Sequence, residues 1–222
     1  MRNNNDQNSS KSRFFDIKPR TVAFLGVYVA LFIIMTFVPQ VGYIKVGPIN
    51  ATMMAIPVTL ATIHYGWKGA VFGIACFIIS SIVGTLFFLP PIIGFVGGWG
   101  NLLVIFIIGR LLILIPLLSI VFIVKKLQNN KSGKEHGKIS KYIYGFILGL
   151  TISIFNTVFV ATLIFVYMHK VGTFKDSYWV FIASLGINIS VEWTVPPIIA
   201  MITSSLGFYL ERKEQSAKID RY

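Results

Sequence analysis

Four polar side chains interrupt long apolar runs in the second half of the chain. Arg110 and Glu192 each lie well inside such a run, as the one charged residue there. Ionisable residues at this depth in a membrane are costly, and they usually face the interior of a helix bundle and have a function. Asn188 precedes Glu192 by one helical turn on the same face. With Asn156 from a third run, these side chains are predicted to form one polar layer.

Two interpretations of this layer stay open. In the first, Arg110 and Glu192 form a structural ion pair, and the asparagines make hydrogen bonds between helices. In the second, the layer binds a polar solute, because the planar fork of an arginine matches a carboxylate and amide groups match hydroxyls and amides. The two interpretations are compatible, since a site can pair its own charges while it is empty.

Two glycine-rich segments precede apolar runs on the same predicted side of the membrane. The first, GYIKVGPIN, contains Tyr43 and ends at Asn50, and the second, GGWGN, contains Trp99 and ends at Asn101. Asparagine is a good N-cap, so each segment could be only a turn before a capped helix. Glycines also permit close backbone approach, and aromatic side chains supply an apolar cover. We expect these segments to close over a pocket.

The whole composition points to a membrane protein. The chain has 222 residues, 55% of them hydrophobic, with a mean hydropathy of +0.75. A soluble domain of this length would need more polar surface. The net charge of +12 lies almost entirely between and outside the apolar runs, where basic residues set orientation and contact anionic lipid rather than nucleic acid. The one cysteine, Cys76, lies in an apolar run, so no disulfide framework is indicated.

Six apolar runs predict an all-α membrane protein, a bundle of six transmembrane helices. The second run is short for a span and contains Pro57, whereas the sixth is long and contains Pro196-Pro197, where we expect tilt or a kink. The runs are Thr21–Val38, Ala51–Tyr65, Gly69–Leu89, Leu102–Val124, Tyr142–Met168 and Val180–Leu210.

Basic residues predict the orientation. With both termini in the cytoplasm, every lysine and arginine outside the spans lies inside, except Lys45, Lys170 and Lys175, which is a strong positive-inside pattern. The expected organisation is a disordered cytoplasmic segment over residues 1–19, one transmembrane substrate-binding domain over 20–212 and a cytoplasmic tail over 213–222.

Motif searches argue against an enzyme. No GxxxxGK[ST], GxSxG or HExxH occurs, and no histidine has a metal-ligand partner at suitable spacing, so we expect no catalytic residue, metal or cofactor. In the first run, Ala23, Gly26 and Ala30 form a stripe of small residues. Such a stripe serves helix packing within the bundle or the docking of another membrane protein.

A resemblance to a known family rests on several of these segments. GYIKVGPINATMMAIPVTL (Gly42–Leu60) resembles the loop and second helix of S components, the substrate-binding subunits of energy-coupling factor (ECF) vitamin transporters, and it is most similar to the pantothenate branch. Further matches follow in the expected order at GNLLVIFIIGRLL (Gly100–Leu112), NTVFVATLIF (Asn156–Phe165) and INISVEWTVPPII (Ile187–Ile199).

The resemblance implies a multi-pass subunit of the bacterial cell membrane. Such a subunit binds a vitamin under its first and third loops and then associates with a membrane scaffold subunit and two ATPases, which hydrolyse ATP. The stripe of Ala23, Gly26 and Ala30 would dock onto the scaffold, and Arg110 would hold the anionic group of pantothenate. The substrate-binding residues expected are Tyr43, Asn50, Trp99, Asn101, Arg110, Asn156, Asn188 and Glu192.

Two departures keep alternatives open. Met54 stands where the family motif often has histidine, and the stretch before Asn101 is less polar than usual. An S component for riboflavin, a pyridoxine-like compound or a thiamin precursor is therefore an alternative, as is a membrane scaffold protein without a solute.

Overall fold

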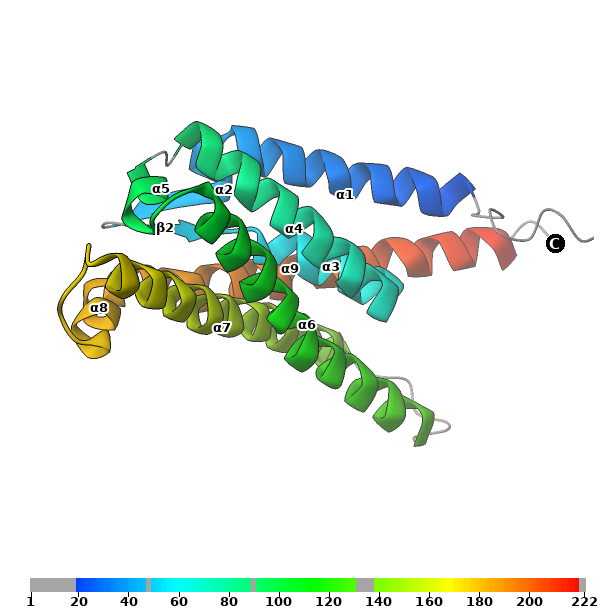
Figure 1. Cartoon of the computed structure of the whole chain (residues 1–222). Helices are drawn as coiled ribbons and strands as arrows, with labels where there is room; N and C mark the ends of the chain where they lie inside the picture. Colours follow the sequence, from blue (N-terminus) through cyan, green and yellow to red (C-terminus); the bar gives the residue numbers. More distant parts are fainter. Residues whose placement is uncertain (1–18, 47–48, 89–90, 131–137, 220–222) are drawn as a thin grey trace, which may run out of the picture.

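The computed structural model describes residues 19–46, 49–88, 91–130 and 138–219, and it is mostly helical (Figure 1). The predicted disordered segment therefore lies almost wholly outside the described residues. Long helices form the body of the molecule, and all the short elements except α3 gather at one end (Figure 1). The long helices are α1 (Pro19–Phe37), α4 (Trp67–Phe88), α6 (Trp99–Asn130), α7 (Lys138–Val171) and α9 (Gly186–Ile219). The shorter elements are α2 (Pro39–Gly42), β1 (Tyr43–Val46), β2 (Ile49–Thr52), α3 (Ala55–Tyr65), α5 (Pro91–Phe95) and α8 (Tyr178–Ser184).

The two ends of the molecule differ in construction. Helix α1 begins at the end where α9 finishes, and α2, β1, β2, α5 and α8 gather at the opposite end, called the cap end below (Figure 1). This arrangement agrees with two termini on one side of the membrane. Which side that is stays a prediction. Helix α9 also runs through the expected start of the tail, residue 213, to Ile219.

Length and composition support fewer spans than the six predicted. Helix α4, residues 99–126 of α6 and residues 142–171 of α7 are long and apolar enough to cross a membrane, and the bent pair of α8 with α9 counts as a fourth if it is one span. Residues 22–37 of α1 form a shorter apolar helix. Helix α3 has 11 residues, fewer than a span needs. The helical membrane class is confirmed, whereas the count of six is not.

A β-hairpin replaces the loop expected before the second helix. Strands β1 and β2 pair antiparallel, with Tyr43 opposite Thr52 at the open end. The sequences YIKV and INAT are rich in the aromatic and β-branched residues that favour strands. The prediction that Asn50 caps the second helix is wrong, because Asn50 lies in β2 and α3 begins at Ala55. The side chain of Asn50 lies outside the described part of the structure.

The break in the last apolar run also differs from the prediction. The chain bends by 57° between α8 and α9, at Leu185, whereas Pro196 and Pro197 lie inside the continuous helix α9. A Cβ added to Gly149 of α7 would lie 3.0 Å from the Cα of Pro197. Because a small residue faces the prolines, α7 and α9 approach closely there, and this packing supports the helix across them.

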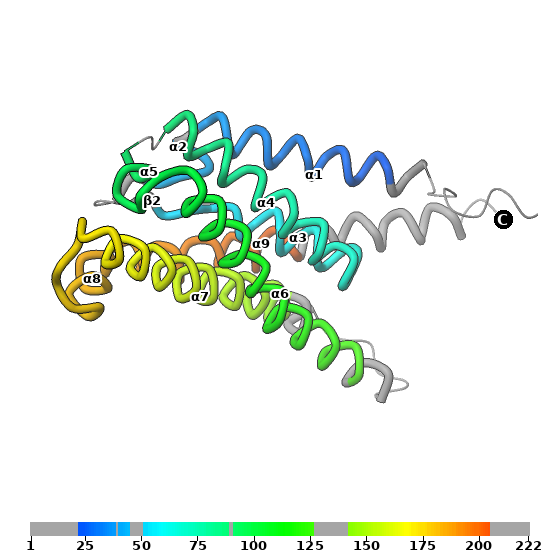
Figure 2. The backbone as a smooth tube through the Cα atoms, viewed as in Figure 1, coloured from blue at the N-terminus to red at the C-terminus, as the bar shows by residue number. Residues whose placement is uncertain are grey.

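Two apolar clusters stabilise the bundle, one on each side of the polar layer. The inner cluster includes Ile113 of α6 and Ile152 of α7, with residues of α3 and α4. The outer cluster, nearer the cap end, includes Phe106 of α6 and Val160 of α7, with residues of α8. Helices α6 and α7 pass side by side through both clusters (Figure 2). The polar residues predicted from the sequence therefore lie where the two clusters meet.

Candidate functional site

A cavity lies between the two apolar clusters and is lined by residues of α4, α5, α6, α7, α9 and the hairpin. Its volume is about 90 Å³, several times the roughly 10–15 Å³ that a cavity needs to hold one water. This size suits a small metabolite. Of the predicted binding residues, the cavity brings together Tyr43, Arg110, Asn156, Asn188 and Glu192.

The lining changes character along the cavity. Ile92, Ile164, Leu185 and Ile189 form an apolar rim, and Arg110 and Asn156 lie deeper. Along α7, Ile164 is about 12 Å nearer the cap end than Asn156 at about 1.5 Å per residue. A ligand with one charged end and one apolar end matches this gradient.

Arg110 is almost completely buried, with 5% of its surface exposed. Its Cζ lies 4.4 Å from the ring centroid of Phe106 and 5.0 Å from that of Phe77, and both contacts are favourable cation–π geometry. Its Nε and Nη1 have no hydrogen-bond partner among the described residues. A buried charge with unpaired donors is costly, and an anion in the cavity would offset that cost through a charge-assisted interaction with the guanidinium. This side chain is therefore suited to bind an anion.

Glu192 is similarly buried, at 8% exposure, but both oxygens of its carboxylate accept hydrogen bonds from the protein. Its Oε1 accepts a hydrogen bond from the backbone N of Thr52, at 2.8 Å, and its Oε2 accepts one from Oγ1 of Thr157, at 2.7 Å. Within the described part of the chain, no ion pair within 4.0 Å joins Glu192 to Arg110. The structural ion pair, one of the two interpretations of the polar layer, is thus not the arrangement seen.

Tyr43 of β1 covers the cavity from the hairpin side. Its hydroxyl donates a long hydrogen bond to the backbone oxygen of Ser80, at 3.4 Å. Burial raises the pKa of the Tyr43 phenol above its ordinary value, although nearby Arg110 opposes the shift. The hydroxyl therefore stays protonated and neutral at physiological pH.

Two predicted residues lie away from the cavity lining. Trp99 is 41% exposed at the start of α6. The amide of Asn101 donates backwards to the carbonyl oxygens of Val96, at 2.8 Å, and Gly97, at 3.4 Å. Asn101 thus closes the turn between α5 and α6, in which Gly97 and Gly98 have positive φ angles that favour glycine. Their roles in binding stay predictions.

The structure adds hydroxyl-bearing residues that the sequence analysis did not select. Thr52, Ser81, Thr85 and Thr157 all line the cavity. Serine and threonine are ordinary inside apolar helices because their hydroxyls can bond to the carbonyl one turn earlier, as Ser81 does to Phe77. Thr52 and Thr157 could have been selected from the sequence, because they lie in NATMM and NTVF, two parts of the segments that carry the family resemblance.

Comparison with known proteins found one curated relative at a significant level. The chain is 28% identical over 202 residues to the pantothenic acid transporter PanT of Lactococcus lactis subsp. cremoris strain MG1363, covering 85% of this chain and 91% of that protein. No family model matches, and no solved structure matches significantly. The similarity confirms the resemblance drawn from the motifs, and with the long apolar helices it identifies a multi-pass protein of the bacterial membrane that resembles transport proteins.

Proposed function

We propose that this chain is the vitamin-binding S component of an ECF-type importer and that its ligand is pantothenate. The observation that carries the proposal is the buried guanidinium of Arg110, which lines a cavity and has two nitrogens without partners among the described residues. The similarity to the pantothenic acid transporter supports it independently.

Pantothenate has a group to match each part of the cavity lining. Its carboxylate would pair with Arg110, and its amide and hydroxyl groups would bond to Asn156, Asn188 and the hydroxyl of Thr85. Its dimethyl group would lie against the apolar rim, which includes Ile164 and Leu185. Riboflavin, pyridoxine-like compounds and thiamin precursors have no carboxylate, so they would offer Arg110 only neutral acceptors, which form weaker hydrogen bonds with it than an ionised group does. This difference in charge supports pantothenate as the proposed ligand.

The energy for transport would come from partner subunits. Ala23, Gly26 and Ala30 are exposed on α1, and a Cβ added to Gly26 would meet nothing within 4 Å. Packing within the bundle therefore does not explain the small-residue stripe. We propose that it docks onto the membrane scaffold subunit, which carries two ATPases, because small residues let helices approach closely.

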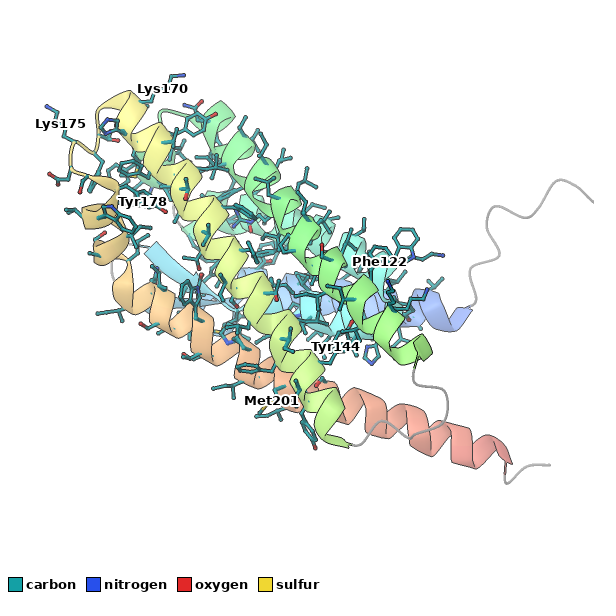
Figure 3. All side chains as sticks on the ribbon, turned by 90° about the horizontal axis from the view of Figure 1, so that it is seen from below. Phe122, Tyr144, Lys170, Lys175, Tyr178 and Met201 are labelled. Carbon is teal, nitrogen blue, oxygen red and sulfur yellow. The ribbon has the colours of Figure 1, made fainter. Side chains whose placement is uncertain are left out.

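The test is binding of labelled pantothenate to the purified chain in detergent. The Arg110→Ala variant should weaken binding at least about 100-fold, because two charge-assisted hydrogen bonds are lost, while its elution volume stays that of a folded protein. The matched control is Lys170→Ala, because Lys170 is exposed at the cap end (Figure 3). Panthenol, which has an alcohol in place of the carboxylate, should compete weakly against pantothenate.

Two outcomes would contradict the proposal. Normal pantothenate binding by Arg110→Ala would exclude this cavity as the site. Mass spectrometry of the denatured, purified chain that released a different vitamin would exclude the ligand, and if no small molecule were released and none bound, the scaffold-protein alternative would stand.

A further inference from the structure

The carboxylate of Glu192 joins three elements of the structure. From α9 it accepts one hydrogen bond from the backbone of β2, at Thr52, and one from α7, at Thr157. The Thr157 hydroxyl also accepts a bond from Nε1 of Trp193, at 3.3 Å, and lies 3.0 Å from the backbone oxygen of Ser153. One side chain therefore connects the hairpin to the helices that form the far side of the cavity.

Thr52 stands where the hairpin meets the helical bundle. It is the last residue of β2 and pairs with Tyr43 at the open end of the hairpin. Its own Oγ1 accepts from the backbone N of Met54, at 3.2 Å, while Met53 N donates to Gly42 O, at 2.9 Å. The bond from Glu192 therefore holds the base of the hairpin directly beside the residue that covers the cavity.

The hydrogen-bond partners of Glu192 and Arg110 indicate different roles for these two buried charges. Both oxygens of Glu192 bond to protein groups, whereas two nitrogens of Arg110 have no partner in the described residues. An anionic ligand is attracted to Arg110 and repelled by a second carboxylate. Each oxygen of Glu192 thus already has a protein partner, and the carboxylate has no electrostatic reason to contact the anionic group.

We propose that Glu192 is a positioning residue that latches the β1–β2 hairpin to α7 and α9 and holds it closed over the bound ligand. The proposal rests on the proposed function in one respect, that the cavity binds a small molecule. It differs from the sequence prediction, in which Glu192 contacts the substrate. The latch sets how long a ligand stays in the cavity, and Arg110 sets which ligand is chosen.

Hydrogen exchange of the ligand-free chain tests the latch without any ligand. Glu192→Ala should raise the exchange rate of the amides of residues 43–46 and 49–52 by about tenfold or more, because the charge-assisted bond to the Thr52 amide is lost. Glu192→Gln should stay close to the parent chain. Its carbonyl can still accept from Thr52, and Thr157 can accept from its amide while directing its own proton to Ser153.

Ligand dissociation provides the second readout. With labelled pantothenate, Glu192→Ala should dissociate about ten times faster or more, and Glu192→Gln within about threefold of the parent rate. Thr157→Val removes one of the two bonds to the carboxylate and should have an intermediate effect. In all three variants the preference for pantothenate over panthenol should be unchanged, because Arg110 is untouched.

The outcomes separate this proposal from the proposed function. Unchanged hairpin exchange in Glu192→Ala would overturn the latch, as would a Glu192→Gln variant as defective as Glu192→Ala, or loss of the preference for the carboxylate. If Glu192→Ala does not fold, Thr157→Val decides, and unaltered exchange and dissociation in that variant would overturn the latch. If the parent chain fails to bind pantothenate, pantothenate is excluded as the ligand. The hydrogen-exchange experiment would still test the latch, because it uses no ligand.

Discussion

Two walls of the same cavity each bury one charged side chain, and the walls differ in how many hydrogen bonds they provide to that charge. The cationic wall consists of Arg110 with Phe106 and Phe77, and two of its nitrogens have no partner in the described residues. The anionic wall consists of Glu192 with Thr52 and Thr157, and both carboxylate oxygens are hydrogen-bonded. Both charged side chains are at least nine-tenths buried, so exposure to water does not explain the difference.

The comparison shows how one cavity can divide stability from recognition. Burying a charge without partners costs several kcal/mol, of order 3–5 when one member of a pair is removed. The anionic wall avoids that cost within the chain, using a backbone amide and a hydroxyl. Among the described residues, the guanidinium contacts two aromatic rings and leaves two nitrogens without a hydrogen bond, so an incoming carboxylate gains an interaction that these residues do not provide. The wall whose buried charge lacks hydrogen-bond partners is therefore the wall expected to bind the ligand.

The first way to sharpen the comparison is Arg110→Lys, which keeps the charge and removes the fork. Lysine is a point charge and cannot present two parallel donors to a carboxylate. Pantothenate binding should weaken about 30-fold, corresponding to about 2 kcal/mol for one charge-assisted bond. Titration with labelled ligand measures this loss, and the preference for pantothenate over panthenol should shrink without disappearing. Lysine as good as arginine would mean that the cationic wall acts by charge alone.

The sequence predicted that Arg110 and Glu192 lie in one polar layer but not that their partners differ. Arg110 and Glu192 are conspicuous because a charge inside an apolar run is costly, and the chain order of the runs predicted that these charges meet at one level. Whether they pair with each other depends on distances of a few ångström between helices, which no residue pattern encodes. The partner of Glu192 is a backbone amide of β2, and a backbone amide has no signature in the sequence.

The hairpin and the last break show a second limit. Gly42 and the Gly47-Pro48 pair indicated a loop, whereas Tyr43–Val46 and Ile49–Thr52 pair as strands β1 and β2. Likewise, Pro196-Pro197 indicated a kink, whereas α9 is continuous there and the bend lies at Leu185. In both places tertiary packing decides between local conformations of similar free energy.

A smaller effect on the cationic wall is expected from Phe106→Leu. Leucine keeps most of the apolar volume but removes the aromatic face that lies 4.4 Å from the guanidinium carbon of Arg110. A cation–π contact at a desolvated site contributes about 0.5–2 kcal/mol, so pantothenate affinity should fall about fivefold as the guanidinium loses its support. Phe95→Leu, at an exposed phenylalanine of α5, is the matched control and should bind normally. An equal loss for panthenol would mean that Phe106 contacts the ligand instead of positioning Arg110.

The smallest effect should come from the hydroxyl of Tyr43, where the hairpin meets the cavity. Tyr43→Phe removes a hydrogen bond of 3.4 Å to Ser80, a length at which such a bond contributes little. Because the ring that covers the cavity remains, affinity and dissociation rate should change less than about threefold. Tyr43→Ala removes the ring as well and should speed dissociation clearly more. If Tyr43→Phe alone lowered affinity by about tenfold or more, the hydroxyl would be a ligand contact, and recognition would extend from the cationic wall to the hairpin.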